Sequence, residues 1–151
     1  MGKKKVIKKS QEELLKERES IESKIQKQEI IAGKRTAITG AKLFIYSSYN
    51  NTILTLTDSK GNVLAWTSAG RIGFKGTKKG TPYAANRVAE VMAQMIQKMK
   101  LDNIQVKVKG IGGGRESAVR TLVAKGIELA SIEDITPIPH NGCKRPKSRK
   151  L

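Results

Sequence analysis

The feature that most constrains the fold is the order of apolar patterns between residues 42 and 136. Three short segments rich in β-branched and aromatic residues come first. Two more strand-like segments follow, each preceded by a helical pattern. Closely spaced strands pair antiparallel, whereas a strand–helix–strand connection places its two strands parallel. The order β-β-β-α-β-α-β therefore predicts an α/β fold with a mixed sheet and helices packed on it.

Local signals mark the ends of these elements. Thr81 can cap a helix whose first residue is Pro82, since a proline there leaves no N–H unpaired. Gly126 can end the second helix in the left-handed conformation. The segment 70–81 is too polar and glycine-rich for regular structure. The expected strands are 42–48, 52–57, 62–68, 104–109 and 129–136, and the expected helices are 82–100 and 116–125.

The chain divides into three parts. Residues 1–40 are predicted to form a basic arm and an amphipathic helix at about 10–31. Residues 41–136 form the α/β domain, and residues 137–151 form a basic tail. The apolar stripe of the first helix can dock on a neighbour or stay solvated, and we favour solvated or partner-dependent order. The stripe consists of Leu14, Ile21 and Ile25.

Positive charge extends along the whole chain. Lysine and arginine total 30 against 13 acidic residues, a net charge of +17, with +5 in residues 1–35, +7 in 36–136 and +5 in 137–151. Self-repulsion of this size opposes compaction, so we expect a polyanionic partner. Nucleic acid and an anionic membrane surface both qualify. The membrane is less favoured because there is no apolar run of about 20 residues and no signal peptide, so a cytosolic or equivalent organellar location is expected.

The segment 70–81, GRIGFKGTKKGT, combines four glycines with Arg71 and three lysines. Cations meet phosphates, and glycines let a backbone approach closely. Phe74 can stack on an unpaired base or pack beneath the loop. We predict a nucleic-acid-binding loop, and the alternative is a solvated loop whose lysines keep the protein soluble.

The segment 110–116, GIGGGRE, joins a predicted strand to a predicted helix. Backbone N–H groups and the helix dipole favour an anion at such a junction. A dinucleotide fingerprint would need glycine where Arg115 stands, and the chain has no P-loop. A phosphate of an RNA backbone fits the same geometry, with Arg115 and Arg120 supplying charge. A structural tight turn is the alternative.

The tail, residues 137–151, holds three prolines, five cations and no acid. Such a segment cannot fold alone, and we expect it to lie along a nucleic-acid groove while its counterions are released. The alternative is a disordered tail that aids solubility. Asn141 and Gly142 supply a turn, and this pair is open to isoaspartate formation.

One cysteine and one histidine limit the chemistry of the chain. Cys143 cannot form an internal disulfide, and no Cys/His cluster has metal-ligand spacing. His140 is expected to contact RNA or support a turn, and not to act as a catalytic base. We predict no catalytic residue, no metal and no cofactor.

The domain and tail resemble the bacterial-type eleventh small-subunit ribosomal protein, a universal family. The resemblance runs from about Ala41 to Leu151, and PHNGC followed by basic residues and proline is its most specific part. The segments that carry it are YNNTILTLTD, WTSAGRIGFKGTKKGTPYAA, KGIGGGRE and DITPIPHNGCKRPKSRKL.

This resemblance implies a ribonuclease H-like mixed sheet and a structural role in the small ribosomal subunit. It implies binding to ribosomal RNA on the platform, near the messenger RNA exit path and the E site. The implied partners are the seventh, eighteenth and twenty-first proteins of the series, messenger RNA and initiation factor three. The predicted RNA-binding residues are Asn50, Asn51, Thr52, Arg71, Phe74, Lys75, Lys78, Lys79, Lys109, Gly112, Gly114, Arg115, Arg120, His140, Asn141, Lys144, Arg145, Lys147, Arg149 and Lys150.

Two other functions compete with this hypothesis. Ribonuclease H-like sheets can host two-metal nucleases, but these need clustered carboxylates. Asp58 lies at a predicted turn, Asp134 near a domain edge, and Glu90 is alone on its helix, so we expect no catalysis. An architectural nucleic-acid-binding protein outside the ribosome is the remaining alternative, because charge alone would permit it.

Overall fold

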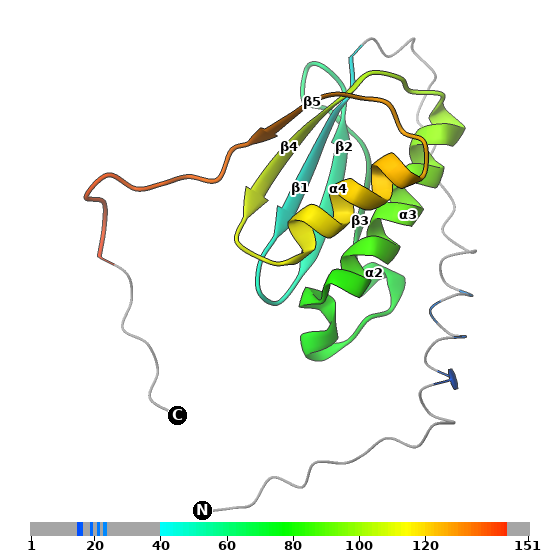
Figure 1. Ribbon diagram of the computed structural model, residues 1–151, viewed down its shortest axis with the longest axis horizontal. Coiled ribbons are helices and arrows are strands. Elements are labelled where there is room, and N and C mark those ends of the chain that lie inside the picture. The colour runs from blue at the N-terminus through cyan, green and yellow to red at the C-terminus, as the bar shows by residue number, and fades with distance from the viewer. Residues whose placement is uncertain (1–14, 17–18, 20, 22, 24–39, 145–151) are drawn as a thin grey trace, which may run out of the picture.

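Five strands form one sheet, and two long helices cover one of its faces (Figure 1). The structure is a computed structural model that describes residues 15, 16, 19, 21, 23 and 40–144. In chain order the elements are β1 (Lys42–Ser47), β2 (Thr52–Thr57), β3 (Val63–Ser68), α2 (Ala69–Ile72), the 3-10 helix η1 (Gly76–Gly80), α3 (Pro82–Met99), β4 (Ile104–Gly110), α4 (Gly114–Ala124) and β5 (Leu129–Asp134).

The sheet has the strand order β3-β2-β1-β4-β5. β1 pairs antiparallel with β2, and β2 pairs antiparallel with β3. β4 pairs parallel with β1 on one side and with β5 on the other. The predicted mixed sheet with packed helices is therefore confirmed.

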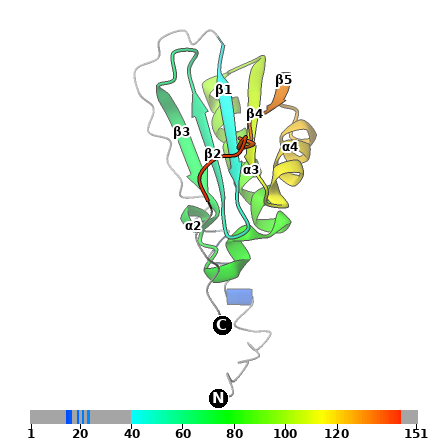
Figure 2. The ribbon, with the colours of Figure 1, turned by 90° about the vertical axis from the view of Figure 1, so that its left-hand side faces the viewer.

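The core lies between the sheet and α3. Alternate residues of each central strand point toward the helices, and the pairs Leu43 and Ile45 of β1 and Leu54 and Leu56 of β2 are completely buried. The apolar face of α3 lies against them, with Val88 at its centre. Figure 2 shows the opposite side of the sheet, where no helix of residues 40–144 packs.

Both ends of α3 follow from local chemistry. The Thr81 hydroxyl accepts a hydrogen bond from the Ala84 N–H at 3.2 Å, as a helix cap does, and Pro82 opens the helix. At the other end Lys100 takes a left-handed conformation, with φ of 53°, and stops the helix. The predicted cap and first residue are confirmed.

The segment 70–81 was expected to lack regular structure, and this prediction is wrong. Its first part belongs to α2, where the Ser68 hydroxyl accepts a bond from the Arg71 N–H at 3.3 Å. Its last part is η1. The ordering has a simple cause, because Ile72 and Phe74 insert into the core and hold the polar residues around them in place.

Two boundaries also differ from the expected ones. α4 begins at Gly114, two residues earlier than predicted, because Gly113 already has helical dihedral angles. β5 ends at Asp134 instead of residue 136. The Asp134 carboxylate accepts bonds from the N–H and hydroxyl of Thr136, at 2.9 and 2.6 Å, and these bonds turn the chain there.

The first predicted helix is described only at residues 15, 16, 19, 21 and 23, and all five are helical. Ile21 is half-buried and packs against the core of the domain, whereas Leu15 is exposed. The solvated or partner-dependent order of this helix stays a prediction. Leu14 and Ile25 of the same stripe lie outside the described residues. No helix in the described ranges is long and apolar enough to cross a membrane.

Close backbone approach fixes the junction between β4 and α4. Gly110 has φ of 108°, and a side chain there would overlap the Ser47 carbonyl. A Cβ at Gly114 would lie 2.7 Å from the Thr52 hydroxyl oxygen and 2.9 Å from the Ala85 Cβ. Gly113 differs, because its φ is −64° and a Cβ would find its nearest neighbour at 3.9 Å, on Pro82.

We therefore expect Gly110→Ala to lower the free energy of unfolding by about 3 kcal/mol, since it adds both a strained φ and a steric overlap. Gly113→Ala is the matched control and should change stability by no more than about 0.5 kcal/mol. Urea unfolding followed by circular dichroism measures both. Equal stability of the two variants would contradict the proposed packing of this junction.

Candidate nucleic-acid interface

Three loops meet at one end of the sheet. Parallel pairing brings the carboxyl ends of β1, β4 and β5 to this end, and the helices α3 and α4 both begin there. A side chain at Gly80 would overlap the Tyr49 carbonyl, and Gly112 donates its N–H to the Ser47 carbonyl at 3.0 Å. We call residues 48–51, 70–81 and 110–113 the loop cluster.

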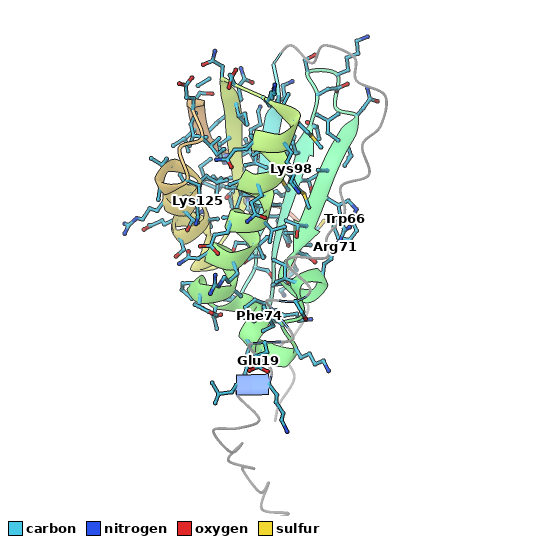
Figure 3. All side chains as sticks on the ribbon, turned by 90° about the vertical axis from the view of Figure 1, so that its right-hand side faces the viewer. Glu19, Trp66, Arg71, Phe74, Lys98 and Lys125 are labelled. Carbon is cyan, nitrogen blue, oxygen red and sulfur yellow. The ribbon has the colours of Figure 1, made fainter. Side chains whose placement is uncertain are left out.

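The basic segment 70–81 supplies most of the charge of the loop cluster and contains no acid. Lys75 and Lys78 are exposed, and Lys79 is half-buried. Phe74 is only 7% exposed, and its ring meets that of Tyr83 edge-to-face at 5.9 Å (Figure 3). Phe74 therefore packs beneath the loop, the second of its two expected roles, and is not placed to stack on a base.

Arg71 is exposed but has a defined position. Its guanidinium lies 4.7 Å from the ring centre of Trp66 and donates to the Trp66 carbonyl at 2.9 Å (Figure 3). We did not predict a role for Trp66, although period-two alternation along residues 63–68 places it opposite the buried Thr67. This stacking holds the cation of Arg71, a member of the loop cluster, at the edge of the sheet.

The two glycines predicted to admit an RNA backbone lie close to other parts of the same chain. Gly112 and Gly114 are buried, and side chains there would meet Ser47, Ser48 and Thr52 of the same chain. Thr52 is also fully buried, and its hydroxyl lies 3.3 Å from that of Ser47. Internal packing therefore accounts for these three residues, and their contacts with RNA stay predictions.

The two asparagines of the β1–β2 turn have different roles. The Asn51 side chain accepts a bond from the Thr52 N–H at 3.0 Å, and the Asn51 backbone bonds with Ser48 at 2.9 and 3.2 Å. Asn51 therefore shapes the turn. Asn50 is exposed at its tip and remains placed to meet a ligand.

Arg115 forms hydrogen bonds beside the Gly-rich junction between β4 and α4. Its guanidinium donates to the Gly110 carbonyl at 2.7 Å and to the Asp134 carboxylate at 3.0 Å. Hydrogen bonds from the Thr136 side chain and backbone, with the charge of Arg115, hold the pKa of Asp134 below its usual value. The guanidinium of Arg115 is therefore already bound within the fold, and its contact with a phosphate stays a prediction.

Acidic side chains gather on the opposite flank, formed by α4, β5 and the adjoining side of α3. The ion pairs of the described residues there are Arg120–Glu116, Arg115–Asp134, Arg87–Glu90 and Lys125–Glu90. Val108, Val119 and Ile132 line an open groove of about 310 Å³ between them. This flank is therefore close to neutral, whereas the loop cluster is cationic.

Arg120 differs from Arg115 in exposure. Its bond to Glu116, at 3.3 Å, joins side chains that are 81% and 76% exposed. An exposed pair of this kind contributes little, so Arg120 can exchange its partner for a phosphate. Lys109, at the end of β4, is also exposed.

The tail leaves β5 and projects away from the sheet (Figure 1). Residues 137–144 are exposed, and Asn141 has a positive φ of 51°, as the predicted turn requires. His140 and Lys144 both face solvent. The remaining predicted tail contacts, Arg145, Lys147, Arg149 and Lys150, lie outside the described residues.

The carboxylates considered as a nuclease site, Asp58, Glu90 and Asp134, do not form a cluster, and each is bound to other groups of the chain. Asp58 accepts bonds from the backbone and side chain of Asn62 at 2.9 and 2.8 Å, and Glu90 pairs with Arg87 and Lys125. Within residues 40–144 and the five helical positions, no three His, Cys, Asp or Glu side chains come together as metal ligands would. The charge of the loop cluster suits an anionic ligand.

Comparison with known proteins gives a family. The ribosomal protein S11 family matches residues 41–150. Small ribosomal subunit protein uS11 of Caldicellulosiruptor saccharolyticus is 54% identical over 107 residues, which cover 71% of this chain and 82% of the relative. That of Francisella tularensis subsp. novicida is 50% identical over 117 residues, 78% of this chain and 91% of the relative. The chain therefore belongs to the ribosomal protein S11 family, structural proteins of the small ribosomal subunit, and is not an enzyme.

Proposed function

We propose that this protein binds small-subunit ribosomal RNA through the loop cluster and the tail, and that it supports assembly and translation without any turnover. The observation that carries the proposal is the basic segment 70–81, in which Arg71, Lys75 and Lys78 are exposed and Lys79 is half-buried, while the apolar residues are buried. A disordered basic loop would have to be ordered on binding. Here the core has already ordered it.

The RNA backbone would meet cations that stand on rigid supports. Lys75 and Lys78 are exposed, and Phe74, which is packed in the core, holds the segment that carries them. Phosphate contacts of this kind fix position and orientation. The contacts we propose are Asn50, Arg71, Lys75, Lys78, Lys79, Lys109, Arg120, His140, Asn141 and Lys144, with the four tail cations beyond them.

The resemblance to the family supports a more detailed placement. It favours a ribonuclease H-like sheet, with which the order β3-β2-β1-β4-β5 agrees. It also favours the platform, beside the messenger RNA exit path and the E site, in cytoplasmic or organellar ribosomes. The seventh, eighteenth and twenty-first small-subunit proteins, messenger RNA and initiation factor three are the partners proposed there.

Substituting Lys78 and Lys79 together by glutamine should weaken binding to ribosomal RNA and make it less sensitive to salt. With each phosphate contact that is lost, fewer counterions are released on binding. The slope of log K against log salt should therefore fall by about 2 in magnitude. Fluorescence anisotropy over a series of salt concentrations measures the slope.

The matched control removes the same charge from the other end of the molecule. Lys98→Gln with Lys100→Gln, at the end of α3, should leave the slope within about half a unit of that of the unchanged protein. If both double variants changed the slope equally, the loop cluster would have no special role and general charge would suffice.

The place of action can be tested by fractionation. The protein should co-sediment with small ribosomal subunits through a high-salt wash, because many contacts act together with recognition of the shape of folded RNA. Release into the supernatant at moderate salt, or equal affinity for duplex DNA and ribosomal RNA, would refute ribosomal binding and favour an architectural nucleic-acid-binding protein.

A further inference from the structure

The face of the sheet turned away from α3 and α4 faces the viewer in Figure 2. By the strand register, this face carries aromatic and cationic side chains in adjacent rows. In one row Phe44 of β1 stands between Thr55 of β2 and Lys107 of β4, and Thr55 is paired in turn with Trp66. The next row contains Tyr46, with Lys109 as its partner on β4, and the previous row contains Lys42. We call this surface the open face.

Large rings on the open face are exposed to water. Tyr46 is 45% exposed and Trp66 48% exposed, and neither belongs to the core. Within residues 40–144, no helix covers them. Exposed aromatic surface gathered on one sheet is typical of a binding site.

Charge decides which kind of partner suits the open face. Lys42, Lys107 and Lys109 point to it from the central strands, and the acid that the register places there is Glu133, which pairs with Lys107 at 3.1 Å. A surplus of cations remains. The α4–β5 flank, in contrast, is neutralised by its own ion pairs, so the open face is the one that complements a polyanion.

Trp66 and Arg71 form a ready stacking unit. The guanidinium lies over the indole at 4.7 Å, and its bond of 2.9 Å to the Trp66 carbonyl keeps it there. Bases that are not paired stack on aromatic rings and on guanidinium planes alike. Arg71 also belongs to the loop cluster, so an RNA strand bound at the loop cluster can continue onto the open face.

We propose that the open face binds an unpaired segment of RNA, with bases stacked on Tyr46 and on the Trp66–Arg71 unit and phosphates near Lys42 and Lys109. The two stacking positions lie two strands apart, roughly 10 Å across the sheet. The inference rests on the proposed RNA-binding function and adds a second site to it, one that requires single-stranded bases.

Trp66 is the only tryptophan of the chain, so its fluorescence reports on this site in the unmodified protein. Ten-nucleotide unpaired oligoadenylate should quench the emission in a saturable manner, because a base stacks on the unit that contains the indole. A ten-base-pair RNA duplex should bind with much weaker quenching, because its bases are not free to stack. Anisotropy of labelled RNA measures binding in the same samples.

Variants locate the contact. Tyr46→Ala should weaken binding of the oligoadenylate about tenfold, and Tyr46→Phe, which keeps the ring, should restore it to within about twofold. Lys109→Gln should also weaken it. Lys98→Gln, which removes one exposed lysine on the helix side (Figure 3), is the matched control and should have no effect.

The possible failures are distinct. If neither RNA changes the anisotropy, the proposed RNA-binding function itself is wrong. Oligoadenylate that binds without quenching, and equally well to Tyr46→Ala, would overturn the open-face site alone. In assembled small subunits, ultraviolet cross-links from Trp66 or Tyr46 to nucleotides would support the site, whereas cross-links from both to a neighbouring protein would overturn it.

Discussion

Burial of one face of α3 against the sheet is the interaction on which the rest of the structure depends. Ala84, Ala85 and Ala89 on that face are small, so the helix axis comes close to the strands, and larger side chains further along fill the space that remains. Thr81, the last residue of the basic segment, caps this helix, which begins at Pro82. Packing in the core therefore sets the position of the loop cluster, although the cations of that cluster make almost no core contact themselves.

The same arrangement explains why glycine is needed at the carboxyl end of the sheet. Gly80 and Gly112 each touch the backbone of the β1–β2 turn, from opposite sides, and Gly114 lets α4 start against Thr52. Loops that carry function gain precision when a rigid scaffold positions them. Three connections far apart in the sequence act here as one surface, because the segments 70–81 and 110–113 both contact the backbone of the third, the β1–β2 turn.

Much of this could be predicted from the sequence, for identifiable reasons. Strands such as residues 52–57 and the cap at Thr81 depend on neighbours in the chain, so their patterns were sufficient. The role of a glycine is harder to predict. The sequence shows the same residue whether the glycine is needed for close approach to RNA or for close approach to Ser47. The bond between Arg115 and Asp134 could not be predicted for a related reason, because the two residues are 19 positions apart. The open face could have been recognised from alternation alone, had the polar side of each strand been considered as well as the buried side.

The separation of charge between the loop cluster and the α4–β5 flank has a consequence for how the protein meets its partner. Within residues 40–144, a body whose exposed cations gather at the loop cluster, while the acids of the α4–β5 flank are bound in pairs such as Lys125–Glu90, has an uneven distribution of charge and carries an electric dipole. In the field of a polyanion such a body experiences a torque and rotates while it is still diffusing. First encounters would then take place with the correct end foremost, so that fewer collisions are wasted in wrong orientations.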